Sequence, residues 1–447
     1  MKKIKYLLLL LIFSFSTAFA QEGSLLNHAR NSHMKGELQK AAELIRQYIA
    51  DNPNSAEGYI DAGIIFRDLG EYDSSISFLS KAIKIDPESS NAHNERGVTL
   101  IELGRFQNAV KEFDRALELD PDHSGAFNNR GLAYYYLNRP DEAIDNYSRS
   151  IELNPNIANT WSNRGLVLFE KGRLDEALSD INKAINLEPA SANALNNRGM
   201  VYQKMGKKQQ AIEDYSAAIA FNPAKAVFFR NRGIAYMESG DVRSAFSDFT
   251  IALTLNPDAL DIYKFRGNLH YDMGNFEKAA SDLTKALQYF PDDNYLYYLR
   301  GMCNHEMEYF DLAIEDYTQA VKINPGYSKA YYSRSYSYLE KENYIAAIED
   351  LESTVRLNPQ HFEAYTMLGY INRKIANYDE ALEALNKAIE INPEFAAAYF
   401  DRAVTFEHMN QNSPAIKDLK RFIDLTDHGS EFVDQLENAK KRLANLK

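Results

Sequence analysis

The strongest constraint on this chain is the spacing of its prolines. Eleven of its thirteen prolines fall at a constant interval of 34 residues. A fixed period of this length is typical of chains built from stacked copies of one supersecondary element, in which each copy buries its apolar face against its neighbours. The sequence therefore predicts a repeat architecture. The periodic prolines are Pro53, Pro87, Pro121, Pro155, Pro189, Pro223, Pro257, Pro291, Pro325, Pro359 and Pro393.

Other positions recur in step with the prolines. When proline is placed at position 32 of each repeat, position 8 is Gly in nine repeats and position 20 is Ala in eleven. Positions 4, 11 and 24 carry large residues, such as Phe127, Tyr134 and Tyr147. This spacing predicts two short amphipathic helices per repeat, with a turn at glycines such as Gly70 and Gly104. The small residues are expected to let the two helices approach closely.

This pattern of aromatic, Gly, Tyr, Ala, aromatic, Ala and Pro resembles the tetratricopeptide repeat family. The resemblance implies an all-α fold, a right-handed α-solenoid superhelix of helix-turn-helix repeats. It also implies a concave groove lined mainly by the first helix of each repeat. Twelve repeats are expected, at residues 22–55, 56–89, 90–123, 124–157, 158–191, 192–225, 226–259, 260–293, 294–327, 328–361, 362–395 and 396–429.

The two ends of the chain have their own patterns. Residues 1–20 combine early lysines, an apolar run and Ala18-Phe19-Ala20, which is typical of a secretory signal peptide. Gln21 follows the expected cut, so lipidation of a new terminal cysteine is not expected. Residues 430–447 place Phe432, Leu436, Ala439, Leu443 and Leu446 on one helical face, as expected of a helix that caps the last repeat. An exported protein is expected, periplasmic or envelope-associated in a Gram-negative bacterium, with secretion as the second choice.

No pattern in the sequence indicates an enzyme. Phosphate-binding loops, dinucleotide fingerprints, zinc helices and nucleophile elbows are missing from it. We expect no catalytic residue, no metal and no cofactor. The single cysteine, Cys303, is expected to be a packed core residue.

The charge narrows the class of partner. The net charge is −13, and removal of the three signal lysines leaves 47 basic and 63 acidic residues, a net charge of −16. Such a surface disfavours nucleic acid and anionic membranes. We therefore expect a protein or peptide partner, no nucleic acid and no membrane span in the mature chain. The amphipathic C-terminal helix favours a monomer.

Arginine and an acid vary together along the repeats. The three repeats that lack Arg at position 7 also lack the acid at position 23, which predicts a hydrogen-bonded pair within a repeat or between neighbours. The alternative is an arginine stripe that binds an anionic ligand. The arginines are Arg96, Arg130, Arg164, Arg198, Arg232, Arg266, Arg300, Arg334 and Arg402. Their expected acceptors are Glu112, Asn146, Asp180, Asp214, Asp248, Asp282, Asp316, Asp350 and Asp418.

Asparagines gather at positions that the resemblance places on the concave groove. In the family, asparagine ladders there hold extended peptides by their backbone amides, and a primary amide both donates and accepts hydrogen bonds. The alternative is that each asparagine is an ordinary feature of the family's repeats. The expected binding residues are Asn94, Asn128, Asn129, Asn163, Asn196, Asn197 and Asn231.

Tyrosines replace the asparagines in the later repeats. Tyr295, Tyr298, Tyr332 and Tyr336 are expected to face inward as contact residues, with packing between neighbouring first helices as the alternative. Lys264, Asn268 and Lys329 fit the family's clamp for a C-terminal carboxylate, and they are included among the expected binding residues. Leu299 and Ser333 stand where the clamp needs an amide and an Arg, so the complete clamp is not predicted.

The function predicted from the sequence is a non-enzymatic scaffold. Its groove would bind an extended peptide or a partner helix in the bacterial envelope. The alternative is an accessory subunit of an envelope glycan or polysaccharide assembly or export system. Tyrosines that present ring faces would favour glycans, whereas buried, edge-on tyrosines would favour protein partners or packing.

Overall fold

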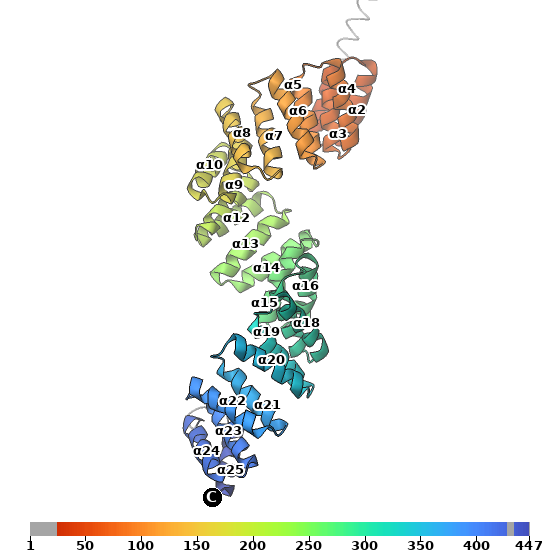
Figure 1. Ribbon diagram of the computed structural model, residues 1–447. Helices are drawn as coiled ribbons and strands as arrows, with labels where there is room; N and C mark the ends of the chain where they lie inside the picture. Colours follow the sequence, from red (N-terminus) through yellow and green to blue (C-terminus); the bar gives the residue numbers. More distant parts are fainter. Residues whose placement is uncertain (1–24, 427–432, 447) are drawn as a thin grey trace, which may run out of the picture. The chain divides into compact units, whose positions relative to one another are not determined.

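The computed structural model describes residues 25–426 and 433–446 as paired helices. No strand occurs in those residues, so the all-α prediction is confirmed. The chain divides into two compact units at Ala235 and Tyr236, inside helix α13. Within each unit, antiparallel helix pairs follow one another in chain order (Figure 1).

The N-terminal unit begins with a helical segment at residues 25–34, which packs on α2. The later helices of this unit follow in pairs, and α13 continues past its boundary. They are α2 (Leu38–Asp51), α3 (Ala56–Asp68), α4 (Tyr72–Ile85), α5 (Ser90–Glu102), α6 (Phe106–Leu119), α7 (Ser124–Tyr136), α8 (Pro140–Leu153), α9 (Ala158–Glu170), α10 (Leu174–Leu187), α11 (Ala192–Lys204), α12 (Lys208–Phe221) and α13 (Ala226–Ser239).

The C-terminal unit continues the same alternation of first and second helices. Its helices are α14 (Val242–Leu255), α15 (Leu260–Asp272), α16 (Phe276–Tyr289), α17 (Asn294–Glu306), α18 (Phe310–Ile323), α19 (Ser328–Glu340), α20 (Tyr344–Leu357), α21 (Phe362–Lys374), α22 (Tyr378–Ile391), α23 (Ala396–His408), α24 (Asn412–Thr426) and α25 (Val433–Asn445).

The helix starts follow the period of the prolines. From Ala56 to Ala396, the first helices begin 34 residues apart. Each periodic proline lies in the turn before a first helix; across Pro53, for example, the Ser55 N–H donates to the Asn52 carbonyl at 3.1 Å. Proline suits this place because it cannot donate the bond that would continue the preceding helix. The division of residues 22–429 into twelve repeats stays a prediction, since its two ends fall outside the described residues.

Glycine at position 8 brings the two helices of a pair into close contact. A Cβ atom built on Gly199 would lie 2.6 Å from Cε1 of Tyr215, and one on Gly97 would lie 2.5 Å from Cε1 of Phe113. The residues at position 20, from Ala41 to Ala415, are fully buried. The expected close packing of small against large residues is therefore confirmed.

The turn inside a pair requires a left-handed residue. Gly70 has φ +78°, and glycine takes this conformation without the steric cost that a Cβ atom brings. Five other turns place a residue with a side chain there, at φ values between 56° and 65°. These residues are Asn138, Glu308, Glu342, Ala376 and Asn410.

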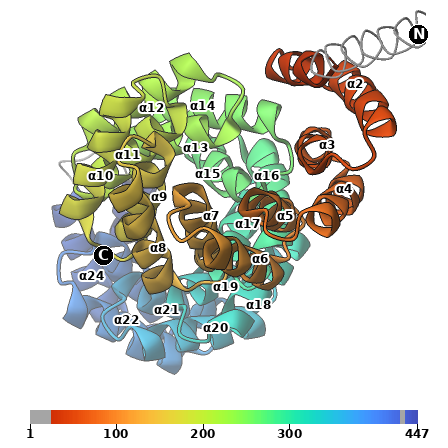
Figure 2. The same cartoon turned by 90° about the horizontal axis from the view of Figure 1, so that it is seen from above.

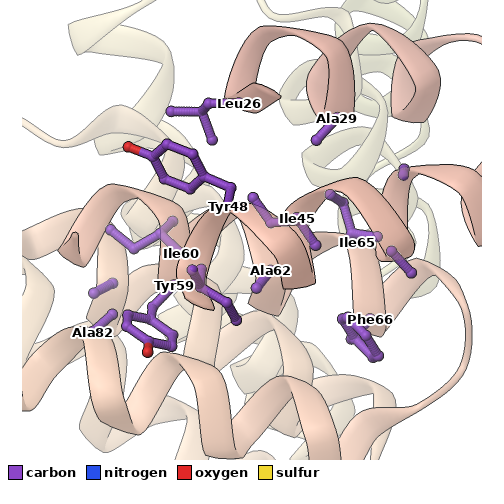
Figure 3. Close-up of a cluster of buried hydrophobic side chains, with 14 residues drawn as sticks. Leu26, Ala29, Ile45, Tyr48, Tyr59, Ile60, Ala62, Ile65, Phe66 and Ala82 are labelled. Atoms are coloured by element: carbon purple, nitrogen blue, oxygen red, sulfur yellow. The ribbon is translucent and has the colours of Figure 1, made fainter. Parts of the chain in front are cut away.

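Side chains from successive helices form the core. Figure 3 shows Leu26, Ile45, Tyr59 and Phe66 in the first such cluster, which joins residues 25–34 to α2, α3 and α4. Successive first helices, such as α9 and α11, also pack on each other. The row of pairs in the N-terminal unit curves in Figure 2, with α9 and α11 nearer the inside of the curve than α10 and α12.

Helix α25 packs on the last helix pair. Ala439 is fully buried in the cluster that contains Leu419 and Phe422, and Leu443 and Leu446 pack against this cluster. Arg442 also pairs with Glu407 at 2.9 Å. This packing is what the expected cap requires, although Phe432 lies outside the described residues.

The expected signal peptide at residues 1–20, and Gln21 after it, also lie outside the described residues. Along the part of the chain that the structure describes, no helix has both the length and the apolar character to cross a membrane.

Candidate functional site

The arginines at position 7 are held by the acids at position 23 of the same repeat. Arg164 donates from Nε and Nη2 to the two carboxylate oxygens of Asp180, at 2.7 and 2.9 Å. Arg334 binds Asp350 in the same two-bond arrangement, and Asp350 is only 4% exposed. The predicted pair is confirmed wherever the structure describes its bonds. These pairs use the guanidinium groups that an anionic ligand would need.

The third arginine nitrogen reaches the preceding repeat. Nη1 of Arg164 donates to Oγ of Ser148 at 3.0 Å, and Nη1 of Arg334 donates to Oγ1 of Thr318 at 2.8 Å. Arg164 and Arg334 therefore each tie three helices together. This acceptor at position 25 of the preceding repeat was not predicted from the sequence. A polar residue that recurs at this position could have indicated it. These residues are Ser80, Asp114, Ser148, Asn182, Ser216, Thr284, Thr318 and Asn386.

Arg130 shows how the charge balance is kept when the acid is missing. Its Nε donates to Asn146 Oδ1 at 2.8 Å, and its Nη1 pairs with Asp114 of the preceding repeat at 2.6 Å. The acid has thus moved from one acceptor position to the other. In the regular pair of Arg198 with Asp214, the hydrogen bond to the carboxylate raises the pKa of the arginine.

The predicted asparagines form hydrogen bonds between neighbouring first helices. Nδ2 of Asn129 donates to Oδ1 of Asn94 at 3.0 Å, and the same bond links Asn163 to Asn128 at 3.4 Å. Asn128 also donates to Asn129 at 3.0 Å. These three bonds form a continuous polar chain across α5, α7 and α9.

The ladder continues across α9, α11 and α13. Asn197 donates to Oγ of Ser162 at 3.2 Å, and Asn231 donates to Asn196 at 2.9 Å. Asn94, Asn196 and Asn231 are buried, so much of their hydrogen-bonding capacity is used in the contact between repeats. Asn128, Asn129, Asn163 and Asn197 are partly exposed, and a role for them in peptide binding stays a prediction.

The predicted tyrosines lie on the first helices of the C-terminal unit. Tyr295 and Tyr298 are on α17, with ring centroids 6.5 Å apart, and Tyr298 packs edge-on against Tyr327 at 5.2 Å. Tyr332 and Tyr336 are on α19, where their hydroxyls are 2.8 Å apart and their rings stand at 83°. The rings are edge-on or tilted to one another, but none of the four tyrosines is buried, so the choice between a protein partner, packing and glycans stays open.

A pocket opens beside Tyr332 and Tyr336. We call it the tyrosine pocket; it has a volume of about 410 Å³ and is formed by α19, α21, α23 and the residue before α23. Its apolar wall is made of Tyr332, Tyr336, Leu339, Met367, Tyr370 and Phe395. Three consecutive first helices thus contribute to one surface hollow.

The polar lining of the tyrosine pocket includes Glu363 and Asp401, and no basic side chain lines it. Asp401 pairs with Arg373 at 2.8 Å, and burial raises the pKa of its carboxyl. Burial also raises the pKa of Tyr332, which keeps this phenol neutral. The carboxylates were missed because position alone does not tell which side chains converge on one hollow.

The residues of the half-matched clamp have the following surroundings. Lys264 pairs with Asp293 at 3.1 Å and lies 5.3 Å from the centre of the Phe290 ring. Lys329 is exposed on α19, and Asn268 has a buried Oδ1 without a hydrogen bond. Leu299, which stands where the clamp needs an amide, is buried. These contacts agree with leaving the complete clamp out of the prediction.

Cys303 lies in the core of the C-terminal unit. Its side chain is fully buried, as expected for a packing residue, and burial raises the pKa of the thiol to about 12. No group of histidine, cysteine and acidic residues in the described ranges could hold a metal ion.

Paired helices with a 34-residue period define the chain as a helical repeat protein. Family models described as tetratricopeptide repeat match residues 125–157, 146–179, 192–225, 266–328, 328–361 and 362–395. A further model, described as TPR repeat, matches residues 63–104, 99–138 and 165–206. Together these matches span 63–225 and 266–395, well over half of the chain. The chain belongs to the tetratricopeptide repeat family, and the count of twelve repeats stays a prediction.

Solved structures with the same type of fold include the APC/C hetero-tetramer Cut9–Hcn1, at 16% identity over 95% of this chain and 98% of that one, with a TM-score of 0.41. PilF of Pseudomonas aeruginosa is similar at 19% identity over 46% and 93%, with a TM-score of 0.42. YrrB, described as a TPR protein with an unusual peptide-binding site, is similar at 26% identity over 41% of this chain and 94% of that one, with a TM-score of 0.33. No curated protein matches the sequence.

Proposed function

We propose that this chain is a non-enzymatic scaffold that binds an extended segment of a partner protein on the surface formed by its first helices. Tetratricopeptide repeats generally mediate protein–protein interactions. The observation that carries the proposal is the tyrosine pocket, a hollow of about 410 Å³ on three consecutive first helices. Its volume and its apolar wall with few polar groups are typical of sites that hold a side chain or a small ligand.

The asparagine ladder is proposed as a second contact surface, within the N-terminal unit. Asn128, Asn129, Asn163 and Asn197 keep part of their surface in solvent. Primary amides there could pair with the backbone of a peptide of any sequence.

We further propose that the protein acts in the envelope of a Gram-negative bacterium, with residues 1–20 as the export signal. The support is the charged start, the apolar run and the Ala18-Phe19-Ala20 site in the sequence. Protein recovered from the periplasm should begin at Gln21. A chain that is recovered only from the cytoplasm and still begins at Met1 would contradict this location.

Photo-crosslinking tests the binding surface. A photoreactive phenylalanine analogue placed at Met367, in the tyrosine pocket, should crosslink a partner in the native host. The matched control carries the analogue at Glu349, which is exposed on the second helix α20. Crosslinks to the same proteins at both positions, or at neither, would contradict the proposal. Mass spectrometry of the crosslinked peptide would show whether one extended segment is bound.

A further inference from the structure

The tyrosine pocket has walls that are held at right angles. The rings of Tyr332 and Tyr336 have centroids 5.1 Å apart at 83°, and the contact between their hydroxyls fixes this arrangement. The Tyr332 ring also packs against the His361 ring, with ring centroids 4.5 Å apart. A ring fixed in this way can offer its negatively polarised face to a ligand with little loss of rotamer freedom on binding.

The charged side chains that line this pocket are acidic. Glu363 and Asp401 line the pocket, and no Lys, Arg or His does. Asp401 pairs with Arg373 at 2.8 Å. Arg373 and Lys374 lie 5.2 and 5.5 Å from the centre of the Tyr370 ring, so this ring already has cations of the chain itself beside it. Glu363 is therefore the carboxylate whose charge is left for a ligand.

The position of His361 bears on whether Glu363 is free. Nδ1 of His361 lies 3.1 Å from Glu363 Oε2, and the N–H of Ala364 points to the same nitrogen at 3.4 Å. One ring nitrogen cannot donate to the carboxylate and accept from the helix N–H at the same time. In the tautomer in which Nδ1 accepts from the N–H of Ala364, it does not donate to Glu363, and the carboxylate is left without this hydrogen bond. The side chain of Glu363 is 43% exposed, so a ligand can reach it.

We propose that the tyrosine pocket takes the cationic side chain of a partner peptide, Lys or Arg, and so makes a basic residue part of the recognised sequence. This rests on the proposed function, in which the first helices bind a peptide. The alkyl stem packs against Met367 and Leu339, and the cation lies over the ring of Tyr336 and near Glu363. Aromatic faces with a nearby carboxylate favour cations, and long basic side chains bury their stems while their heads stay polar.

Other side chains fit this pocket less well. An acidic side chain would be repelled by Glu363. A purely apolar side chain would fill the same space, but it would desolvate the Glu363 carboxylate without offering it a hydrogen bond, which is unfavourable. The overall charge of −13 also favours a basic partner by long-range attraction.

The test uses the full chain and three small probes: N-acetyl-arginine amide, N-acetyl-norleucine amide and N-acetyl-glutamate amide. The Met367 methyl group lines the pocket and reports its occupancy in a methyl NMR spectrum, once Met367→Leu has identified its signal. The arginine probe should shift this signal at concentrations at which the other two probes leave it unchanged. Equal shifts with the norleucine probe would overturn the proposal.

Variants separate charge, ring and fold. Glu363→Gln should weaken the binding of the arginine probe about five-fold, and Tyr336→Leu should do the same, while Tyr336→Phe keeps the ring and most of the binding. Glu352→Gln is the matched control, because Glu352 is an exposed acid that lines a different hollow, between α20 and α22. Far-ultraviolet circular dichroism of each variant checks that it is folded. Unchanged binding in Glu363→Gln would also overturn the proposal.

The two proposals fail differently. If a partner crosslinks at Met367 but the arginine probe has no preference, the pocket binds a peptide without selecting a cation, and only this inference is wrong. If the arginine probe binds but no partner crosslinks at Met367, the cation pocket stands and the proposed function is wrong.

Discussion

Arg334 donates two hydrogen bonds to the two carboxylate oxygens of Asp350, of 2.7 Å from Nε and 2.6 Å from Nη2. Both side chains are largely shielded from water, with 13% and 6% of their side-chain surfaces exposed. Removing one partner of such a pair leaves the other charge buried without compensation. The cost of that is larger than the net contribution of the pair itself.

The first prediction concerns this pair. Asp350→Ala should destabilise the region around α19 and α20 by about 3 kcal/mol. The double variant Arg334→Leu with Asp350→Ala should cost less, because the repeat that starts at Phe362 already has this combination in Leu368 and Ala384. Hydrogen exchange of peptides from α19 and α20 measures both. A double variant that exchanges faster than the single one would contradict this account.

The second prediction concerns the close contact within a pair. Gly199→Ala should destabilise the chain by about 1–3 kcal/mol, because its Cβ would lie 2.6 Å from Tyr215. Gly267→Ala is the control, since the nearest atom, on Leu283, would be 3.1 Å away. Its smaller clash is offset by the better helix propensity of alanine, worth up to about 1 kcal/mol. The melting temperature should fall clearly for Gly199→Ala only.

The third prediction concerns the turns that lack glycine. Ala376→Gly should stabilise the α21–α22 pair by about 0.5–1 kcal/mol, because Ala376 has φ +65° and carries a Cβ atom in the left-handed region. The neighbouring residue Ile375 has φ −96°, so Ile375→Gly should give no such gain. Thermal melting of the two variants provides the comparison, and a lower melting temperature for Ala376→Gly would refute the strain.

The fourth prediction is a pH dependence at His270. Burial lowers the pKa of His270 from 6.5, and its Nδ1 is buried without a hydrogen bond beside the ring of Phe246. A lowered pKa means that the folded protein binds the proton less readily than the unfolded chain. The stability from this group is therefore complete above pH 6.5 and is lost as the pH falls through the folded pKa.

His270→Phe removes this titration. The urea concentration at the midpoint of unfolding measures stability at each pH. Its decrease from about pH 7.5 to about pH 5 should be smaller in His270→Phe than in the parent chain. His305→Phe is the matched control, because Nδ1 of His305, unlike that of His270, has a hydrogen-bond partner, Oγ of Ser337 at 2.9 Å. The same loss in the parent chain and in His270→Phe would exclude His270 as its source.

Much of the fold could be predicted because each repeated residue has a steric reason for its position. Gly199 must be small because Tyr215 packs on it, and Pro53 must follow a helix that it cannot continue. The Arg–Asp pairs could also be predicted, because both partners are lost together in the repeat with Leu368 and Ala384. These constraints act within one repeat and recur in the next.

The site was harder to predict because its contacts are not periodic. Lys264 fits a family binding position, yet it pairs with Asp293 of its own repeat. The tyrosine pocket depends on Glu363, Met367 and Asp401, which occupy common surface positions and converge only because three different first helices pack together. A repeat alignment gives the face of each side chain but not the neighbours that it meets there.

Because Leu368 and Ala384 replace Arg and Asp, α21 lacks the hydrogen bond to the preceding second helix that Arg334 gives α19 and Arg402 gives α23. Under mechanical load, we expect the C-terminal unit to rupture first at the seam between α20 and α21. An optical-trap recording should then show an early extension step that Leu368→Arg with Ala384→Asp removes. A partner bound in the tyrosine pocket would contact both α19 and α21 and would therefore strengthen the contact between these two repeats.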